Sequence, residues 1–170
     1  KEFINLLPLL LEELPRVAMP QQAVRHFDLL LRAAKGYTWV YQLCLTHPPI
    51  LKMLMRTLGF GSLLARQLIA HPEWLDEIFE SDGLKESRTE RVLGILPSRI
   101  DIHATESSLR ALRSFKSLEG FLIATQEALA VSSAESAAWR MTLLAERVIS
   151  LTAQIAAAEV IAKRGLAEIP

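Results

Sequence analysis

Hydrophobic residues recur every third or fourth position along nearly the whole chain, and no run alternates apolar and polar residues with a period of two. This pattern predicts an all-α protein. The expected architecture is a bundle of short helices followed by a long antiparallel helical hairpin. The predicted short helices cover residues 2–14, 19–36, 37–47, 48–59, 62–70, 72–79 and 88–96.

Proline and glycine positions set the expected helix ends. Pro15 stops the first helix, whereas Pro20, Pro48 and Pro72 each suit the first turn of a helix, where no backbone N–H is needed. Gly36 is expected to close the second helix.

Serine residues supply the expected N-caps. Ser62 is a candidate N-cap for residues 62–70. Two Ser and Glu pairs have the spacing of a capping box. These pairs are Ser87 with Glu90, and Ser132 with Glu135.

Two long helices are predicted at about 100–130 and 134–165, separated at Ser132-Ser133. One apolar seam runs along the second of them, with polar residues on another face. The seam comprises Met141, Leu144, Val148, Leu151, Ile155 and Ala158, and the polar face comprises Arg140, Arg147 and Gln154. Gly165 is a candidate C-cap. Pro97 divides the chain into a short-helix bundle, residues 1–96, and the hairpin, residues 97–170, which are expected to pack as one compact domain.

The charge balance argues against a nucleic-acid or membrane partner. The 170 residues include 19 basic and 19 acidic side chains, so no net field attracts the chain to polyanions. Charged and polar residues such as Glu146 and Arg147 interrupt the apolar C-terminal helix, which argues against a membrane span. The start at Lys1 shows neither an initiator Met nor a signal-peptide pattern, so we expect a piece of a longer protein.

Cysteine and histidine residues offer little chemistry. Cys44, the one cysteine, lies in an apolar run and is expected to be buried in a protein of a reducing compartment. The histidines lack the i, i+3 or i, i+4 spacing of helical metal ligands, so a zinc site is not expected. These are His26, His47, His71 and His103. His47 and His71 each precede a proline, which ends a helix there, and we interpret both as joints.

Three further motifs are candidates for functional sites, and we interpret each of them as structural. "GFGS", residues 59–62, could present N–H groups to a phosphate, but no strand precedes it and no P-loop lysine follows. The acids of residues 73–80 are expected to form one solvated helix face: Glu73, Asp76, Glu77 and Glu80. The basic ridge of Arg110, Arg113 and Lys116 is expected to be solvated or ion-paired. No catalytic, cofactor-binding or metal-binding residue is predicted.

Two blocks in order carry a family resemblance. "GSLLARQLIAHPEWLDEIF" (residues 61–79) precedes "LRALRSFKSLEGFLIATQEALA" (residues 109–130), and "LLAERVI" and "KRGLAEIP" follow. This order resembles the bifunctional glutamine synthetase adenylyltransferase/adenylyl-removing enzymes, also called glutamate–ammonia-ligase adenylyltransferases. The matching part is the helical region before the second nucleotidyltransferase domain.

The resemblance implies a cytoplasmic parent enzyme that attaches AMP from ATP to a tyrosine of glutamine synthetase and removes it by phosphorolysis, with Mg²⁺ in two nucleotidyltransferase domains. Glutamine and the PII signal protein set the balance between these activities. This chain would be a non-catalytic linker and regulatory domain that couples the two active sites. Its partners would be the neighbouring nucleotidyltransferase domains.

The chain departs from the family pattern at three positions. Ile123 and Glu127 stand where Arg and Asp are usual, and Ala130 stands where Gly is common. Two rival interpretations stay open. One is a helical-repeat scaffold for a protein partner, suggested by the two His-Pro blocks. The other is an enzyme that holds a nucleotide at "GFGS".

Overall fold

The computed structural model describes residues 2–34, 38–79 and 84–165, and these are helical without strands, which confirms the all-α prediction. Gly36 and Glu80, which entered the sequence predictions, lie outside the described residues. Helices α1 to α6 are Glu2–Glu13, Pro20–Ala33, Thr38–Thr46, Pro48–Phe60, Ser62–Ala70 and Trp74–Phe79. Helices α7, α8 and α9 are Ser87–Ile95, Thr105–Ala128 and Ala134–Arg164, and the 3₁₀ turns η1 and η2 are Leu14–Arg16 and Leu96–Arg99.

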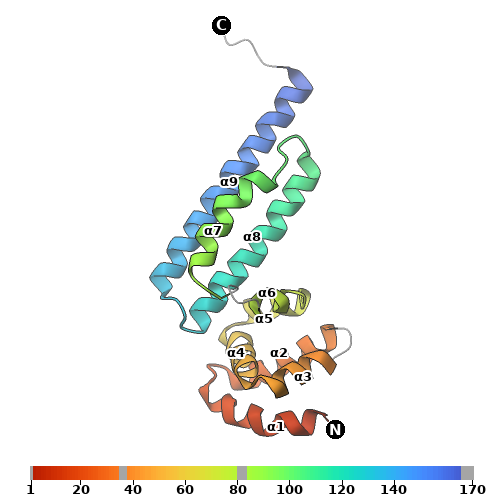
Figure 1. The fold of residues 1–170 in the computed structure, drawn as a ribbon, viewed down its shortest axis with the longest axis vertical. Helices are drawn as coiled ribbons and strands as arrows, with labels where there is room; N and C mark the ends of the chain where they lie inside the picture. Colours follow the sequence, from red (N-terminus) through yellow and green to blue (C-terminus); the bar gives the residue numbers. More distant parts are fainter. Residues whose placement is uncertain (1, 35–37, 80–83, 166–170) are drawn as a thin grey trace.

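The helices form two stacked groups (Figure 1). Helices α1 to α4 make a bundle at the N-terminal end, and α8 and α9 stand on it as an antiparallel hairpin. Helices α5 and α6 lie between the two groups, and α7 runs along the hairpin and packs against α9. The predicted long hairpin is therefore confirmed.

One apolar core joins the bundle to the foot of the hairpin. Buried leucines of α1, α2, α4 and α5 share a cluster with Phe121 and Leu122 of α8. Two smaller clusters lie inside the hairpin, one around Leu93, Ile123 and Leu144, and the other around Leu96, Leu112 and Ile155. Because α8 contributes to all three clusters, its position depends on both groups of helices.

The two His-Pro pairs form the same backbone joint. His47 has φ −132° and ψ 78°, and His71 has φ −132° and ψ 66°. Each histidine carbonyl accepts a bond from the N–H three residues later, at 2.9 Å from Ile50 and 3.0 Å from Trp74. The steric effect of proline on the preceding residue explains the shared geometry. The following helices differ, because α4 has 13 residues and α6 has 6 and begins at Trp74 rather than Pro72.

Three predicted caps are wrong by one residue. Gly61 is the N-cap of α5, and Ser62 is its first helical residue. Ser87 likewise begins α7 and makes no capping bond. At α9 the N-cap is Ser133, whose hydroxyl accepts from the Ser136 N–H at 3.1 Å, so the pair Ser132 and Glu135 does not form the box. The predicted C-cap at Gly165 is confirmed, with φ +75°.

Gly59 lies inside α4 rather than at its end, because the helix continues to Phe60. A Cβ at Gly59 would stand 2.1 Å from Cγ1 of Val17 and 3.1 Å from Cβ of Ala23. The absence of a side chain therefore allows the chain around Val17 to pack directly on α4.

Candidate functional site

Two buried polar clusters lie where the short-helix bundle meets the hairpin, and together they form the candidate functional site. The first, the Arg88 cluster, consists of Glu77 on α6, Arg88 on α7 and Glu119 on α8. Nη2 of Arg88 lies 2.8 Å from Oε2 of Glu77 and 3.2 Å from Oε1 of Glu119. One guanidinium thus connects three helices.

The charged groups of the Arg88 cluster are removed from water, which disfavours their charged forms unless they are paired. Glu119 is only 1% exposed, and its Oε2 atom has no hydrogen-bond partner. Burial raises the pKa of Glu119, and the facing Arg88 only partly offsets this. Burial also opposes the charge of Arg88, but Glu119 and Glu77 outweigh it and raise the Arg88 pKa. Removing Arg88 would leave the buried carboxylate of Glu119 without its cation.

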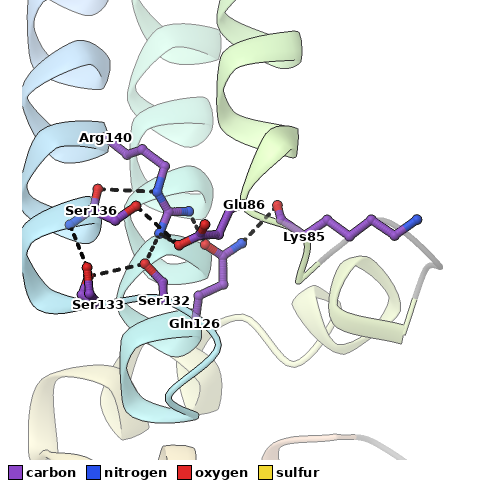
Figure 2. Close-up of polar contacts among 7 residues, drawn as sticks. All are labelled: Lys85, Glu86, Gln126, Ser132, Ser133, Ser136 and Arg140. Atoms are coloured by element: carbon purple, nitrogen blue, oxygen red, sulfur yellow. Dashed lines mark hydrogen bonds and ion pairs between the residues drawn. The ribbon is translucent and has the colours of Figure 1, made fainter.

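The second cluster, the Arg140 cluster, joins the start of α7 to both helices of the hairpin (Figure 2). It consists of Lys85, Glu86, Gln126, Ser132, Ser136 and Arg140. The Arg140 guanidinium is 3% exposed and donates to the Gln126 side-chain oxygen and the Ser132 hydroxyl. The Gln126 amide donates in turn to the Lys85 carbonyl at 3.3 Å.

Glu86 closes the Arg140 cluster at its solvent side. Its Oε1 atom accepts from the Ser136 hydroxyl at 3.1 Å and lies 3.7 Å from Nη2 of Arg140. Hydrogen bonds from Ser132 and Ser136, together with the charge of Arg140, lower the pKa of Glu86. The carboxylate therefore stays charged near neutral pH and completes the pairing of the buried guanidinium.

A tight turn at the end of α8 positions the Arg140 cluster. Ala130 adopts a left-handed conformation, with φ +56°. The Val131 N–H bonds to the Gln126 carbonyl and the Ala130 N–H to the Glu127 carbonyl, both at 2.9 Å, which is the Schellman pattern of helix ends. This turn sends the chain back so that Ser132 reaches Arg140.

The prediction that Arg140 lies on a polar face of α9 is wrong. Arg140 is buried, whereas Met141, which was expected in the apolar seam, is 46% exposed. Both positions continue the three-to-four spacing from the buried Ala137 to Leu144, so periodicity alone does not separate them. Arg140 takes the buried position because it contacts Gln126 and Glu86, which are distant in sequence.

The burial of Glu119, which was not predicted, is indicated by its position in the helical pattern. It continues an apolar stripe, with Leu112 and Phe115 before it and Leu122 after it, at steps of three, four and three residues. A single charge on such a stripe indicates a buried pair. Its partner Arg88 is 31 residues away in sequence, which local patterns do not reveal.

The prediction that the acids around α6 face solvent is confirmed for two residues and wrong for a third. Glu73 and Asp76 are exposed, but Glu77 is half-buried and belongs to the Arg88 cluster. A bond to its own N–H and a second bond to His71 lower the pKa of Glu73. Nδ1 of His71 lies 2.9 Å from the Glu73 carboxylate, and the ring stacks on Trp74 at 4.5 Å.

The other residues considered as sites are dispersed. Nδ1 of His26 bonds to the Leu58 carbonyl at 2.9 Å and ties α2 to α4, and His103 is exposed. Arg110 pairs with Glu106 at 2.9 Å on the exposed face of α8 that also carries Arg113 and Lys116. Cys44 is buried as predicted, and burial raises the pKa of its thiol to about 12.

The described residues form neither a metal-ligand cluster nor a membrane-spanning helix. Within residues 2–34, 38–79 and 84–165, no group of three or more His, Cys, Asp or Glu side chains is placed to hold a metal ion. Over the same ranges, none of the helices is both long and apolar enough to cross a membrane.

The Arg88 cluster and the Arg140 cluster together form what we call the polar junction. The fold and this junction define a class of protein: an all-α module in which an apolar core joins two helical groups and buried ion pairs link α6, α7, α8 and α9. The family profile described as glutamate-ammonia ligase adenylyltransferase matches residues 51–168. The chain belongs to this family. No solved structure matches it significantly.

Curated relatives align along almost the whole chain. The bifunctional glutamine synthetase adenylyltransferase/adenylyl-removing enzyme of Xanthomonas oryzae pv. oryzae (strain MAFF 311018) is 31% identical over 177 residues, and the alignment covers 95% of this chain. The enzyme of the same name from Rhodopseudomonas palustris (strain HaA2) is 25% identical over 167 residues and 97% of the chain. The chain spans 17% of the length of each of these relatives.

Proposed function

We propose that this chain is a non-catalytic linker and regulatory module of a cytoplasmic enzyme that attaches AMP to glutamine synthetase and removes it. One observation carries the proposal. The chain belongs to the family, yet it spans only 17% of relatives whose name joins two opposing activities. A segment of this size within a bifunctional enzyme is suited to connect the parts that perform the two reactions.

In this proposal the chemistry takes place outside residues 1–170. ATP and Mg²⁺ would bind in the neighbouring nucleotidyltransferase domains, and glutamine and PII would provide the regulatory signals. The module would couple the two active sites by changing how its helical groups pack, because coupling requires an element with two discrete arrangements.

The polar junction is suited to such coupling. Arg88 pairs with Glu77 of α6, between the two helical groups, and with Glu119 of the hairpin. The partners of Arg140 come from the start of α7, from α8 and from the loop between α8 and α9. Both arginine side chains are at least nine-tenths buried. A displaced helix would leave a buried charge unpaired at a cost of several kcal/mol. Intermediate packings are therefore penalised, and the junction favours one defined arrangement over a continuum.

The Glu77→Gln variant of the full-length enzyme tests this proposal. It weakens the link between α6 and α7 but keeps the shape of a half-buried side chain, so the fold should survive. We expect AMP attachment and AMP removal each to persist, while their opposite responses to glutamine and PII diminish.

The matched control is Asp76→Asn, the neighbouring exposed acid on the same helix. The control should keep the opposite responses of the parent enzyme. The proposal fails if Glu77→Gln and Asp76→Asn behave alike, and the non-catalytic role fails if the isolated chain transfers AMP from ATP to glutamine synthetase.

A further inference from the structure

An apolar groove runs between α5 and the hairpin, on the face of α8 and α9 that α7 does not line. Its volume is about 500 Å³. Apart from Gln67, Lys116 and Ser117, every lining residue is apolar. The space between α7 and α9 is separate, since Glu90, Gly94 and Trp139 line it instead.

The groove has a floor of small residues and walls of large exposed ones. Gly120, Ala124 and Ala145 line it from the two hairpin helices. Leu63 on α5 is 64% exposed and Ile149 on α9 is 68% exposed, so both present apolar surface to solvent. Small residues at the floor let another backbone approach closely, which suits a helix laid into the groove.

One end of the groove is basic. Lys116 is its one charged lining residue, and Arg113 precedes it by one helical turn on the same exposed stripe of α8. No ion pair of Lys116 occurs among the described residues, whereas Arg110, a further turn away, pairs with Glu106. An occupant with an apolar stripe and a carboxylate at one end would complement this arrangement.

We propose that the groove binds an amphipathic helix of the same polypeptide, from outside residues 1–170, with an acidic side chain that pairs with Lys116. The intramolecular source rests on the proposed function and on the length of the relatives, of which this chain covers 17%. A second copy fits less well, because a two-fold interface uses the same surface of both copies, and the residues that line the groove include no acid that could pair with Lys116 of the other copy.

Site-specific photo-crosslinking of the full-length enzyme tests the proposal. A benzoylphenylalanine at Leu63 reports on the groove, and one at Ile4, 69% exposed on α1, serves as the off-groove control. We expect crosslinks from position 63 to a helix of the same polypeptide outside residues 1–170, with Asp or Glu beside its apolar stripe.

A second pair of variants checks that the groove itself is responsible. Ala145→Glu puts a carboxylate into the apolar lining of the groove, and Ala157→Glu makes the same change at an exposed position of α9 outside it. The crosslink yield should fall about fivefold or more with Ala145→Glu and stay unchanged with Ala157→Glu. Lys116→Met should also lower the yield, and less so at high salt because the lost contact is ionic.

Several outcomes would overturn docking: crosslinks between two copies, crosslinks to another protein or to a segment without acids, or equal yields for both Glu variants. The crosslink does not depend on enzymatic regulation. If position 63 still crosslinks and the Glu77→Gln enzyme keeps its opposite responses to glutamine and PII, only the proposed coupling is refuted. If the crosslink is absent and the Glu77→Gln enzyme loses those responses, only docking is refuted.

Discussion

At the scale of single residues, two positions of the short-helix bundle and the hairpin loop have backbone or packing requirements that glycine meets best. Gly59 has the residue type that its environment requires, since a Cβ there would overlap Val17. Position 130 would also favour glycine, because its backbone adopts the left-handed region at φ +56°, but it carries an alanine. The family resemblance pointed to glycine at position 130, and the Schellman turn now gives the physical reason.

The Ala130→Gly variant should stabilise the protein. Relief of left-handed strain, about 1–2 kcal/mol, exceeds the added flexibility of the unfolded chain, about 0.4–1 kcal/mol. We expect a net gain of about 0.5–1 kcal/mol in the free energy of unfolding, measured with urea. Ala138→Gly, at an exposed interior position of α9, should instead lose about 1 kcal/mol. A loss for Ala130→Gly would contradict the strain argument.

Gly59→Ala should destabilise the bundle by about 1–3 kcal/mol, because the methyl group overlaps Val17. The control is Gly94→Ala in α7, where nothing lies within 4 Å of the added Cβ. That change should raise stability by about 0.5–1 kcal/mol through helix propensity. Thermal unfolding of both variants checks the opposite signs, and equal shifts would disprove the close approach of Val17 to α4.

At the scale of helices, much of the fold was predictable because its signals are local. Pro20 and Pro48 begin α2 and α4, and the His-Pro pairs mark joints, since proline restricts its own residue and the one before it. Adjacent polar residues were harder to separate. Ser132 and Ser133 are both capable of capping α9, and the contact with Arg140, unseen in the sequence, occupies Ser132.

The candidate site was only partly predictable for the same reason. Glu77 was expected in water, and Arg140 on a polar face, because their partners Arg88 and Gln126 lie 11 and 14 residues away. Helical periodicity records which face is apolar but not which charge has a partner there. The pairing belongs to tertiary structure, in which α7 runs along the hairpin and brings Arg88 to Glu77 and Glu119.

The joint at Pro72 yields a prediction for an element boundary. Pro72→Ala removes the restriction on His71 and should cost about 1 kcal/mol, because the unfolded chain gains freedom and α5 is less sharply ended. Pro8, which lies inside α1, provides the opposite test. Pro8→Ala should gain about 1–3 kcal/mol, because it restores a helical hydrogen bond. Urea unfolding measures both, and a stabilised Pro72→Ala protein would refute the joint.

At the scale of the whole molecule, the Arg88 cluster connects α6, α7 and α8 through one buried guanidinium. Arg88→Met should cost about 3–5 kcal/mol, because it leaves the buried Glu119 carboxylate without its cation. The double variant Arg88→Met/Glu119→Leu should regain much of this loss, since no buried charge remains. A double-mutant cycle in urea measures the coupling, and purely additive losses would show that the pair does not interact.

The continuity of α9 has a mechanical consequence. Its 31 residues form one helix from Ala134 to Arg164, and the 24 residue-to-residue steps from Arg140 to Arg164 extend about 36 Å at the rise of an α-helix. A tilt of about 5° at the Arg140 end would move the far end by about 3 Å, by simple geometry from that length. A change of partner at the Arg140 guanidinium that tilted the helix by this angle would therefore displace its far end by about the length of a hydrogen bond.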